Sequence, residues 1–230
     1  MMATRSTSDA RREAADETPA RERILDAAFS AFMEGGFAET STLEIATRAR
    51  VSKRELYALV GSKQDMLVAC IGARAKRLQV PADLPEPHDR ETLSRVLTAF
   101  GTQLLREVSD PTVVAVFQLA IAEAVRAPEV ARTLNAIGVE TGRAALREIM
   151  TRAQPAGLLS GKPAEMAEHF SGLLWGNLMM SLLLRVTDRP SLREIARRAS
   201  AATAAFLQLY PQPNQAETGL SPSDALRSSD

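Results

Sequence analysis

Residues 41–65 read STLEIATRARVSKRELYALVGSKQD and carry the clearest structural pattern in the chain. Three of its serines are each followed, three residues later, by an acid: Ser41 and Glu44, Ser52 and Glu55, Ser62 and Asp65. This pairing is typical of a helix start, because the serine hydroxyl accepts from an exposed backbone amide while the acid reaches back to the serine. The stretch therefore predicts three short helices, at 42–49, 53–60 and 63–79.

The residues before this stretch predict another helix, which supplies the missing apolar wall. Apolar side chains between Ile24 and Met33 recur at helical spacing, and Gly35-Gly36 ends the pattern. Two helices of eight residues cannot bury their apolar faces alone. We expect Phe29 and Phe32 to face the apolar residues of the two short helices, namely Ile45, Ala46, Leu56 and Leu59. The helix pair, joined by the turn 50–52, is then a helix-turn-helix unit that presents its second helix to a major groove.

The rest of the chain predicts longer helices. A proline-rich break at 81–87 precedes them, and Ser191 with Glu194 repeats the helix-start pattern before the last one. The valine-rich run 112–117 is β-like, but it follows Asp110-Pro111 and continues a helical pattern, so it too is predicted as helix. The predicted ranges are 89–108, 111–125, 128–152, 163–186 and 191–209. The fold class is all-α, in two unequal parts.

Polar composition sets the predicted domain boundaries. Residues 1–20 and 211–230 lack an apolar pattern and are predicted as a disordered N-terminal arm and a disordered C-terminal tail. Between them we expect a helix-turn-helix domain with its linking helix at 21–80, and a larger ligand-binding and dimerisation domain at 88–210.

The composition argues against several classes of protein. Lys+Arg and Asp+Glu both number 28, so the chain is no polycation held to its partner by bulk charge. One cysteine and two histidines leave little for a disulfide framework or a metal enzyme, and no nucleotide-binding or nucleophile motif is present. We therefore predict no catalytic residue, no metal site and no cofactor. No signal peptide is visible, and the most apolar run, 173–184, is too short to span a membrane, so we expect a cytoplasmic protein without membrane contact.

Charge gathers locally in the turn of the helix pair. From Ile45 to Arg54 there are four bases and no acid, although the whole chain is neutral: Arg48, Arg50, Lys53 and Arg54. A solvated helix face is the simpler explanation of a charge run alone. Coupled to a capped pair of short helices, the cluster favours a surface that contacts phosphates.

These motifs together resemble the TetR/AcrR family of bacterial transcription regulators. The matching residues keep the family's order and spacing: Arg23–Ala28, Phe32, Gly35–Phe37, Thr40, Ile45-Ala46, Val51–Lys53, Leu56-Tyr57 and Ser62-Lys63. Residues 112–180 are also similar to the AefR-like type of C-terminal domain. The resemblance implies a DNA-binding regulator, most often a repressor, that binds a palindromic operator on double-stranded DNA as a homodimer and is released by a small, apolar effector.

The resemblance implies roles for residues at matching positions. Thr40 and Thr42 would touch backbone phosphate at the start of the first short helix, and Lys53, Tyr57 and Lys63 would grip phosphates around the second. Arg54 and Glu55 would read bases, since arginine pairs with guanine and glutamate accepts from cytosine N4. A capping role for Glu55 is an equal alternative.

Two departures from the family pattern stand in and after the turn. Arg50, also a candidate DNA contact, replaces the usual glycine, so a residue with a side chain is expected to adopt positive φ. Leu59-Val60 replaces a His/Phe-type pair, which removes a phosphate partner and an aromatic core residue.

The second part carries the dimer and effector predictions. Small residues crowd its last two helices, and the resemblance implies that these helices form a four-helix bundle with a second copy. For the candidate dimer residues and the candidate effector residues alike, the alternative is that they fill the core of a single chain. The candidate dimer residues are Gly172, Leu173, Gly176, Ala199, Ala202 and Phe206. The candidate effector residues, apolar with one polar group, are Phe100, Phe117, Gln118, Ile121, Trp175 and Met179.

A second class of function stays open from the sequence. The larger part alone would suit an all-helical small-molecule carrier or a protein-interaction module that does not bind DNA. The basic cluster of the helix pair favours the regulator.

Overall fold

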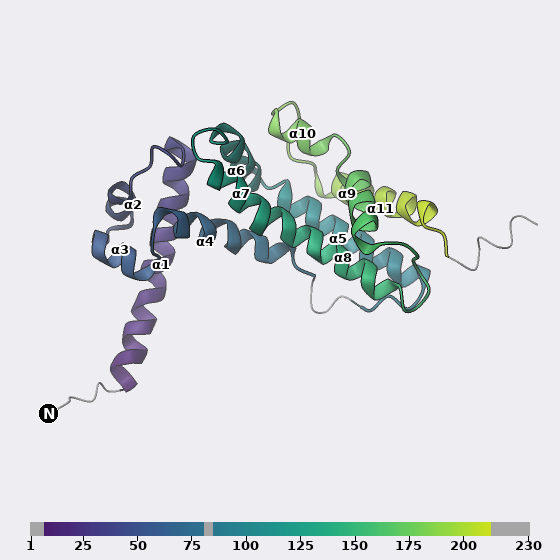
Figure 1. Ribbon diagram of the computed structural model, residues 1–230, viewed down its shortest axis with the longest axis horizontal. Coiled ribbons are helices and arrows are strands. Elements are labelled where there is room, and N and C mark those ends of the chain that lie inside the picture. The colour runs from purple at the N-terminus through teal and green to yellow at the C-terminus, as the bar shows by residue number, and fades with distance from the viewer. Residues whose placement is uncertain (1–6, 81–84, 213–230) are drawn as a thin grey trace, which may run out of the picture. The chain divides into compact units, whose positions relative to one another are not determined.

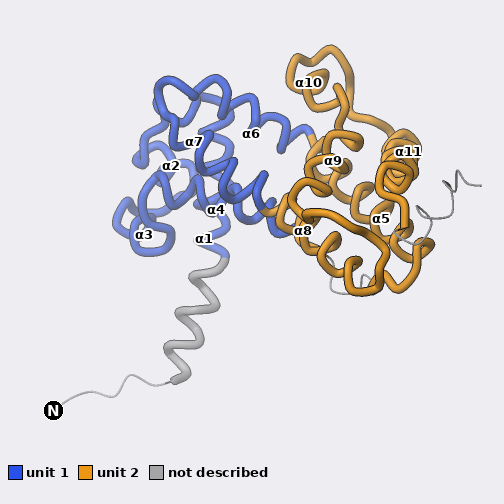
Figure 2. Tube along the Cα trace, turned by 45° about the vertical axis from the view of Figure 1, so that its right-hand side comes forward, with its two compact units in different colours: residues 1–77, 111–140 blue, residues 78–110, 141–230 orange. Residues whose placement is uncertain are grey.

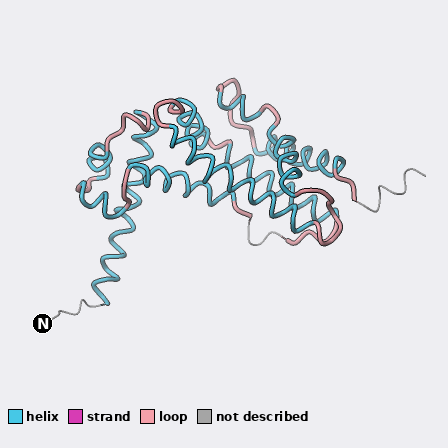
Figure 3. The backbone as a smooth tube through the Cα atoms, viewed as in Figure 1, coloured by secondary structure: helices cyan, strands magenta, loops and turns pink. Residues whose placement is uncertain are grey.

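The computed structural model describes residues 7–80 and 85–212 and is all-α over these ranges (Figure 1). Every regular element in the described ranges is a helix, and the remainder is loop or turn (Figure 3). The all-α prediction is therefore confirmed. The valine-rich run from residue 112 to 117 lies inside α6, Pro111–Ala122, as its helical prediction requires.

The chain divides into two compact units (Figure 2). Unit 1 contains residues 1–77 and 111–140, and unit 2 contains residues 78–110 and 141–230. The predicted boundaries, 21–80 and 88–210, were continuous in sequence and placed 111–140 with the larger part. In the structure this segment packs with the N-terminal helices, because its buried Val116, Ala120 and Val130 share their hydrophobic core.

Unit 1 holds the helix pair and the helices around it. Its elements are α1 (Thr7–Gly35), α2 (Thr42–Ala49), α3 (Lys53–Leu59), α4 (Lys63–Ala75), the 3₁₀ helix η1 (Lys76–Leu78), α6, α7 (Pro128–Thr133) and the π-helix η2 (Leu134–Val139). Helix α1 begins at Thr7, within the arm predicted as disordered, since alanine, glutamate and arginine favour helix without any apolar pattern. Residues 1–6 of that arm, and residues 213–230 of the predicted tail, lie outside the described ranges.

Serine side chains cap the N-termini of the three short helices, as predicted. Ser41, Ser52 and Ser62 each accept a hydrogen bond from the backbone amide three residues later. The reciprocal bond from the acid is present at α4, where Asp65 accepts from the Ser62 amide at 2.7 Å. Hydrogen bonds from Ser62 hold the pKa of Asp65 below its usual value.

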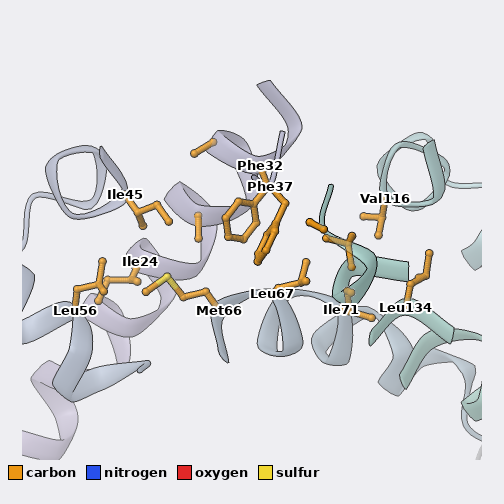
Figure 4. Packing of buried hydrophobic residues seen from close by; sticks show 14 of the residues in the cluster. Ile24, Phe32, Phe37, Ile45, Leu56, Met66, Leu67, Ile71, Val116 and Leu134 are labelled. Carbon is orange, nitrogen blue, oxygen red and sulfur yellow. The ribbon is translucent and has the colours of Figure 1, made fainter. Parts of the chain in front are cut away.

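One apolar cluster holds unit 1 together (Figure 4). Phe32 and Phe37 lie at its centre with ring centroids 5.1 Å apart, and Ile45 of α2 and Leu56 of α3 are fully buried in the same cluster, Leu56 near Ile24 and Met66. Phe32, Ile45, Ala46 and Leu56 are buried in this cluster, as the expected apolar wall requires, and Phe29 and Leu59 are partly buried against it. The ring of Phe29 is covered by Arg74 of α4, whose guanidinium carbon lies 3.9 Å from the ring centre. The helix pair is stable because α1 covers both of its apolar faces.

The turn between α1 and α2 is held by side chains from both sides. The Thr40 hydroxyl donates to the carbonyl oxygens of Gly36 (2.7 Å) and Ala31 (3.1 Å). The Lys63 ammonium donates to three carbonyl oxygens of the turn, those of Phe37 (2.8 Å), Ala38 (3.2 Å) and Thr40 (3.0 Å). The same ammonium lies 4.6 Å from the centre of the Phe37 ring. Lys63 therefore fixes the entry into α2.

Unit 2 is built from α5 (Arg90–Val108), α8 (Glu140–Ala153, of which the first residue belongs to unit 1), α9 (Pro163–Trp175), α10 (Leu178–Leu183) and α11 (Leu192–Leu209). Phe170 and Phe206 meet edge to face at 5.5 Å in its core, and Phe100 is fully buried. The Arg90 guanidinium donates to the carbonyl oxygens of Leu158, Leu207 and Tyr210, which ties the end of α11 to the start of α5.

Two predicted helices are interrupted in the structure. The range 128–152 contains the π-helix η2, which packs on α4: a Cβ on Gly138 would stand 3.8 Å from Ile71 of α4 and 3.1 Å from Leu134 of η2 itself. The range 163–186 breaks at Gly176, whose φ of 47° and ψ of −122° end α9. Arg198 donates to the carbonyl oxygen of Trp175 there, at 3.2 Å.

Replacing Arg50 by glycine is expected to stabilise the protein. Arg50 has φ 57° and ψ 45°, as the sequence predicted for this position, and the left-handed region costs an L-residue roughly 1–2 kcal/mol. Glycine loses part of that gain through its greater freedom in the unfolded chain. We expect Arg50→Gly to raise the free energy of unfolding in urea by about 0.5–1 kcal/mol. Arg50→Val should lower it, because a β-branched residue fits this region poorly; equal stability of the two variants would contradict the argument.

Replacing Lys63 by methionine is expected to loosen the entry into α2. The substitution keeps the apolar stem and removes three charge-assisted hydrogen bonds, so we expect a loss of about 2 kcal/mol in the free energy of unfolding. Lys76→Met, at an exposed position of the same unit, is the matched control and should change stability little. Equal effects of the two variants in urea unfolding would show that the carbonyl contacts of Lys63 carry no stability.

Candidate nucleic-acid interface

Helices α2 and α3 are joined by a three-residue turn. The amide of Val51 donates to the carbonyl oxygen of Ala46 at 3.0 Å, and Ser52 caps α3 directly afterwards. Arg23 of α1 adds a hydrogen bond to the carbonyl oxygen of Ala49, at the C-terminal end of α2. The left-handed backbone of Arg50 thus lets α3 begin immediately while both helices keep their buried faces on α1.

Helix α3 exposes polar side chains along the face opposite its core contact. Leu56 is fully buried and anchors the helix, while Lys53, Arg54, Glu55 and Tyr57 are exposed. A helix with one buried anchor and charged residues on its outer face has the form that enters a major groove.

Three of the predicted phosphate contacts lie together. The Tyr57 hydroxyl is 3.3 Å from Oγ1 of Thr42, which connects α3 to the first turn of α2. The Lys53 ammonium lies 5.9 Å from the centre of the Tyr57 ring. Thr42, Lys53 and Tyr57 therefore form one polar surface at the start of both helices.

The structure bears on the two alternatives for Glu55. Its backbone amide donates to the Ser52 hydroxyl at 3.1 Å, so the serine half of the capping pair is present. Its carboxylate makes no hydrogen bond or ion pair within the described ranges, unlike the carboxylates of Asp65 and Glu194, which complete their capping boxes. The Glu55 carboxylate is therefore exposed and not engaged in capping.

Thr40 and Lys63, two of the predicted phosphate contacts, make hydrogen bonds within unit 1. Thr40 is buried, and its hydroxyl is engaged with the carbonyl oxygens of α1 and the following turn. The three hydrogen bonds that Lys63 donates to carbonyl oxygens all come from its ammonium group, which is the group predicted to bind a phosphate. Spacing along the sequence placed both residues near the helix pair, but only the packed turn reveals that they hold its backbone.

Ion pairs neutralise one member of the basic cluster, Arg48. Arg48 donates to Glu34 of α1 and Glu44 of α2, each at 2.7 Å, and the hydrogen bond to Glu34 is the main reason that its pKa is raised. Arg50, Lys53 and Arg54 have no acidic partner within the described ranges. The uncompensated positive charge is thus concentrated in the turn and the first residues of α3. Glu34 lies before residues 41–65, and no sequence motif indicates that it pairs with Arg48.

The predicted effector residues fall into both units. Phe117, Gln118 and Ile121 belong to unit 1, where Ile121 is 61% exposed, whereas Phe100, Trp175 and Met179 belong to unit 2. Phe100 is a core residue of unit 2 with no exposed surface. Neither unit by itself gathers the six residues into one pocket.

The predicted dimer residues divide between the inner and outer faces of their helices. Gly172, Leu173 and Gly176 are exposed, and a Cβ on Gly172 would meet nothing within 4 Å. Ala199, Ala202 and Phe206 are instead buried in unit 2. Helix α11 carries small residues on most of its faces, so its composition alone does not distinguish the inner face from the outer face.

A groove of about 700 Å³ is lined by residues of unit 2 alone. Leu173 and Leu178 line it from α9 and α10, and Ala201 and Ala205 line it from α11. Charged side chains complete its rim: Asp188, Arg189, Glu194, Arg197 and Arg198. None of the six predicted effector residues lines this groove.

No group of three or more side chains that could hold a metal ion occurs in the described ranges. Cys70 is buried, and burial raises the pKa of its thiol to about 11, which makes it a poor nucleophile. None of the helices in these ranges has the length and apolarity needed to cross a membrane.

Comparisons with known proteins agree with this geometry. Residues 24–70 match the family model of bacterial regulatory proteins of the tetR family, and residues 95–212 match that of the AefR-like transcriptional repressor C-terminal domain. A search of curated proteins gave no match.

Solved structures share the fold over most of the chain. The Flavonoid-responsive Regulator FrrA is 31% identical, with 84% of this chain and 97% of that chain covered and a TM-score of 0.71. A TetR transcriptional regulator from Agrobacterium tumefaciens is 25% identical, with coverage of 86% and 97% and a TM-score of 0.70. A putative TetR-family transcriptional regulator from Mesorhizobium loti is 27% identical, with coverage of 84% and 98% and a TM-score of 0.67. The chain therefore belongs to the tetR family of bacterial regulatory proteins, which are non-enzymatic DNA-binding transcriptional regulators.

Proposed function

We propose that this protein is a cytoplasmic repressor that binds a palindromic operator as a homodimer and releases it when a small, apolar effector binds. The observation that carries the proposal is the outer face of α3. There, Lys53, Arg54 and Glu55 are exposed on a short helix whose Leu56 is fully buried. A rigidly anchored helix with unpaired charged side chains can read base edges without first breaking internal contacts.

The exposed residues divide into two kinds of DNA contact. Arg54 would donate to O6 and N7 of guanine, and Glu55 would accept from N4 of cytosine, so these two would carry sequence specificity. Thr42, Lys53 and Tyr57 would contact phosphates and set the register of α3 in the groove. Arg50 would add a further phosphate contact from the turn. Thr40 and Lys63 would act through the backbone that they hold.

A second copy of the chain would complete the binding site. One short helix contacts too few base pairs for a useful specificity ratio, whereas two helices related by a two-fold axis read a palindrome. The outer face of α9 supports such a pairing, because Gly172, Leu173 and Gly176 are exposed there and the glycines allow close approach. Unit 2 exposes further large apolar side chains, among them Met180, Leu184, Val186 and Leu192.

The effector is proposed as a small molecule with a large apolar surface. The Flavonoid-responsive Regulator FrrA, which is 31% identical to this chain, responds by its name to flavonoids, and this supports an aromatic effector class for this chain as well. A ligand can release DNA only by binding more tightly to the form of the dimer whose recognition helices are wrongly spaced.

The DNA contacts are tested by fluorescence anisotropy with the duplex upstream of the protein's own gene, a scrambled duplex and a salt series. We expect Arg54→Ala to weaken binding to the specific duplex by roughly 10–100-fold, because a bidentate contact to guanine is lost. Lys53→Ala should weaken binding to both duplexes and reduce the salt slope by about 1, as the loss of one phosphate contact requires.

The control for these variants is Lys76→Ala, which removes a positive charge at an exposed position of the same unit. It should bind both duplexes as the wild type does. Wild-type affinity of the Arg54→Ala and Lys53→Ala variants would exclude α3 as the recognition helix and favour a carrier or interaction module.

The dimer is tested with Leu173→Arg. Leu173 is 40% exposed on α9, so the substitution should leave the fold intact while placing a charge in the interface. We expect the mass in solution, measured by light scattering, to fall from that of two chains to that of one, 24.9 kDa. Val125→Arg, at a 93% exposed position of unit 1, is the control and should stay dimeric. A dimer that survives Leu173→Arg would move the interface away from α9.

A further inference from the structure

Leu43 is a large apolar side chain on the outer surface of the helix pair. It lies in the first turn of α2 and is 63% exposed, whereas Ile45 and Ala46 of the same helix are buried. In α2 and α3 together, the large hydrophobic side chains that are exposed are those of Leu43 and Tyr57. The packing of unit 1 therefore does not account for a leucine at position 43.

The two flanks of α2 differ in what they contact. On one flank, Arg48 pairs with Glu44 and reaches Glu34 of α1. The flank on the other side of the buried face carries Leu43 and Thr47, which lie one turn apart and are both exposed. The Thr47 hydroxyl donates to the carbonyl oxygen of Leu43 at 2.9 Å, so it is satisfied within the helix. The Leu43 flank is thus free of the ion pairs that hold the other flank to α1.

Leu43 stands beside the polar surface formed by Thr42, Lys53 and Tyr57. Thr42 is its neighbour in the chain, and Oγ1 of Thr42 is 3.3 Å from the Tyr57 hydroxyl of α3. This contact ties the first turn of α2 to the helix proposed to enter the major groove. Since Arg50 and Lys53 have no acidic partner within the described ranges, the charge around Leu43 favours a polyanion. A duplex held by these groups would lie close to Leu43 as well.

The major groove offers one apolar group to such a side chain. Thymine carries a C5 methyl group there, whereas cytosine has a hydrogen atom at the same position and the purines present only polar groups. Exposed apolar side chains are common on protein surfaces, so exposure by itself assigns no partner. Here the phosphate-contacting groups beside Leu43 assign one, because they would bring a base edge to it. Packing of the leucine on a methyl group removes apolar surface of both from water.

We propose that Leu43 is a specificity-determining residue that selects thymine by packing on its C5 methyl group in the major groove. It acts from α2, whereas Arg54 and Glu55 act from α3 through hydrogen bonds. Because the contact is apolar and releases no counterion, it adds affinity without changing the salt dependence of binding. This role rests on the proposed function, since it needs α3 to lie in the groove.

The experiment removes the methyl group from the DNA without changing its base pairing. The wild-type full-length protein first selects its binding sites from a pool of random-sequence duplexes. Each symmetric pair of thymines in the selected palindrome is then replaced by deoxyuridine, and binding is measured by fluorescence anisotropy. We expect one such pair to weaken wild-type binding by about 10–20-fold, because each lost methyl contact costs roughly fourfold.

Leu43→Ala identifies the side chain that contacts this methyl group. Alanine favours helix and position 43 is exposed, so the fold should be kept. The variant should bind the thymine duplex about 10–20-fold more weakly than the wild type does, and it should no longer distinguish thymine from deoxyuridine at that pair. Leu43→Met keeps a long apolar side chain and should retain most of the discrimination. Neither variant should change the salt slope.

Val68→Ala is the matched control. It shortens another exposed apolar side chain of unit 1, on α4, where Val68 is 39% exposed. This variant should bind the thymine duplex as tightly as the wild type and should lose the same affinity on deoxyuridine substitution.

The other possible results separate this role from the proposed function. Equal binding of thymine and deoxyuridine duplexes by the wild type would overturn the role of Leu43, and so would a loss on deoxyuridine substitution that is as large in Leu43→Ala. A fall of Leu43→Ala to the mass of one chain in light scattering, with discrimination unchanged, would place Leu43 in a contact with a second copy and would also overturn it. If the wild type selects no sequence from the pool, the proposed function itself fails and the role of Leu43 falls with it.

Discussion

The structure depends on the burial of Ile45 and Leu56 in one apolar cluster with Ile24 and Phe32 of α1. Helices of eight and seven residues are too short to be stable in water, since nucleating a helix is costly and few hydrogen bonds follow. Burial of one or two apolar residues from each helix replaces that missing stability. The polar outer face of α3 therefore stays free of internal contacts, which is the condition for reading DNA.

Polar contacts around this apolar cluster fix the position of α2 on α1. Lys63 and Thr40 bind the carbonyl oxygens of the turn before α2, and Arg48 bridges α1 and α2 through Glu34 and Glu44. These polar groups lie around the interface and do not form its reading surface. Within unit 1 they make α1, α2 and α3 a single body, so that a change at the α1–α2 turn would move the recognition helix as a whole.

Local patterns predicted most of the helices and part of the site. Serine–acid pairs located the starts of α2, α3 and α4, and charge together with the capped helix pair located Lys53, Arg54 and Glu55 on an exposed face. The same patterns could not separate Lys63 from Lys53, because a lysine before a helix suits either a phosphate or a carbonyl group. Likewise, Ala199 and Ala202 were interpreted as an outer face, since alanine fits either side of a helix.

Local sequence patterns predict the all-α fold and the helix-turn-helix, because both follow from interactions between residues near one another in the chain, whereas the positive φ of Arg50 is predicted from the resemblance to the tetR family. Only the tertiary structure decided which unit contains segment 111–140, where the predicted long helices break and which charges remain unpaired. These features arise from contacts between residues far apart in sequence, such as Val116 with the α1 core, Arg48 with Glu34, and Glu123 with Gly36. Which residues come into contact in this way depends on how whole helices pack, and no short sequence motif predicts that packing.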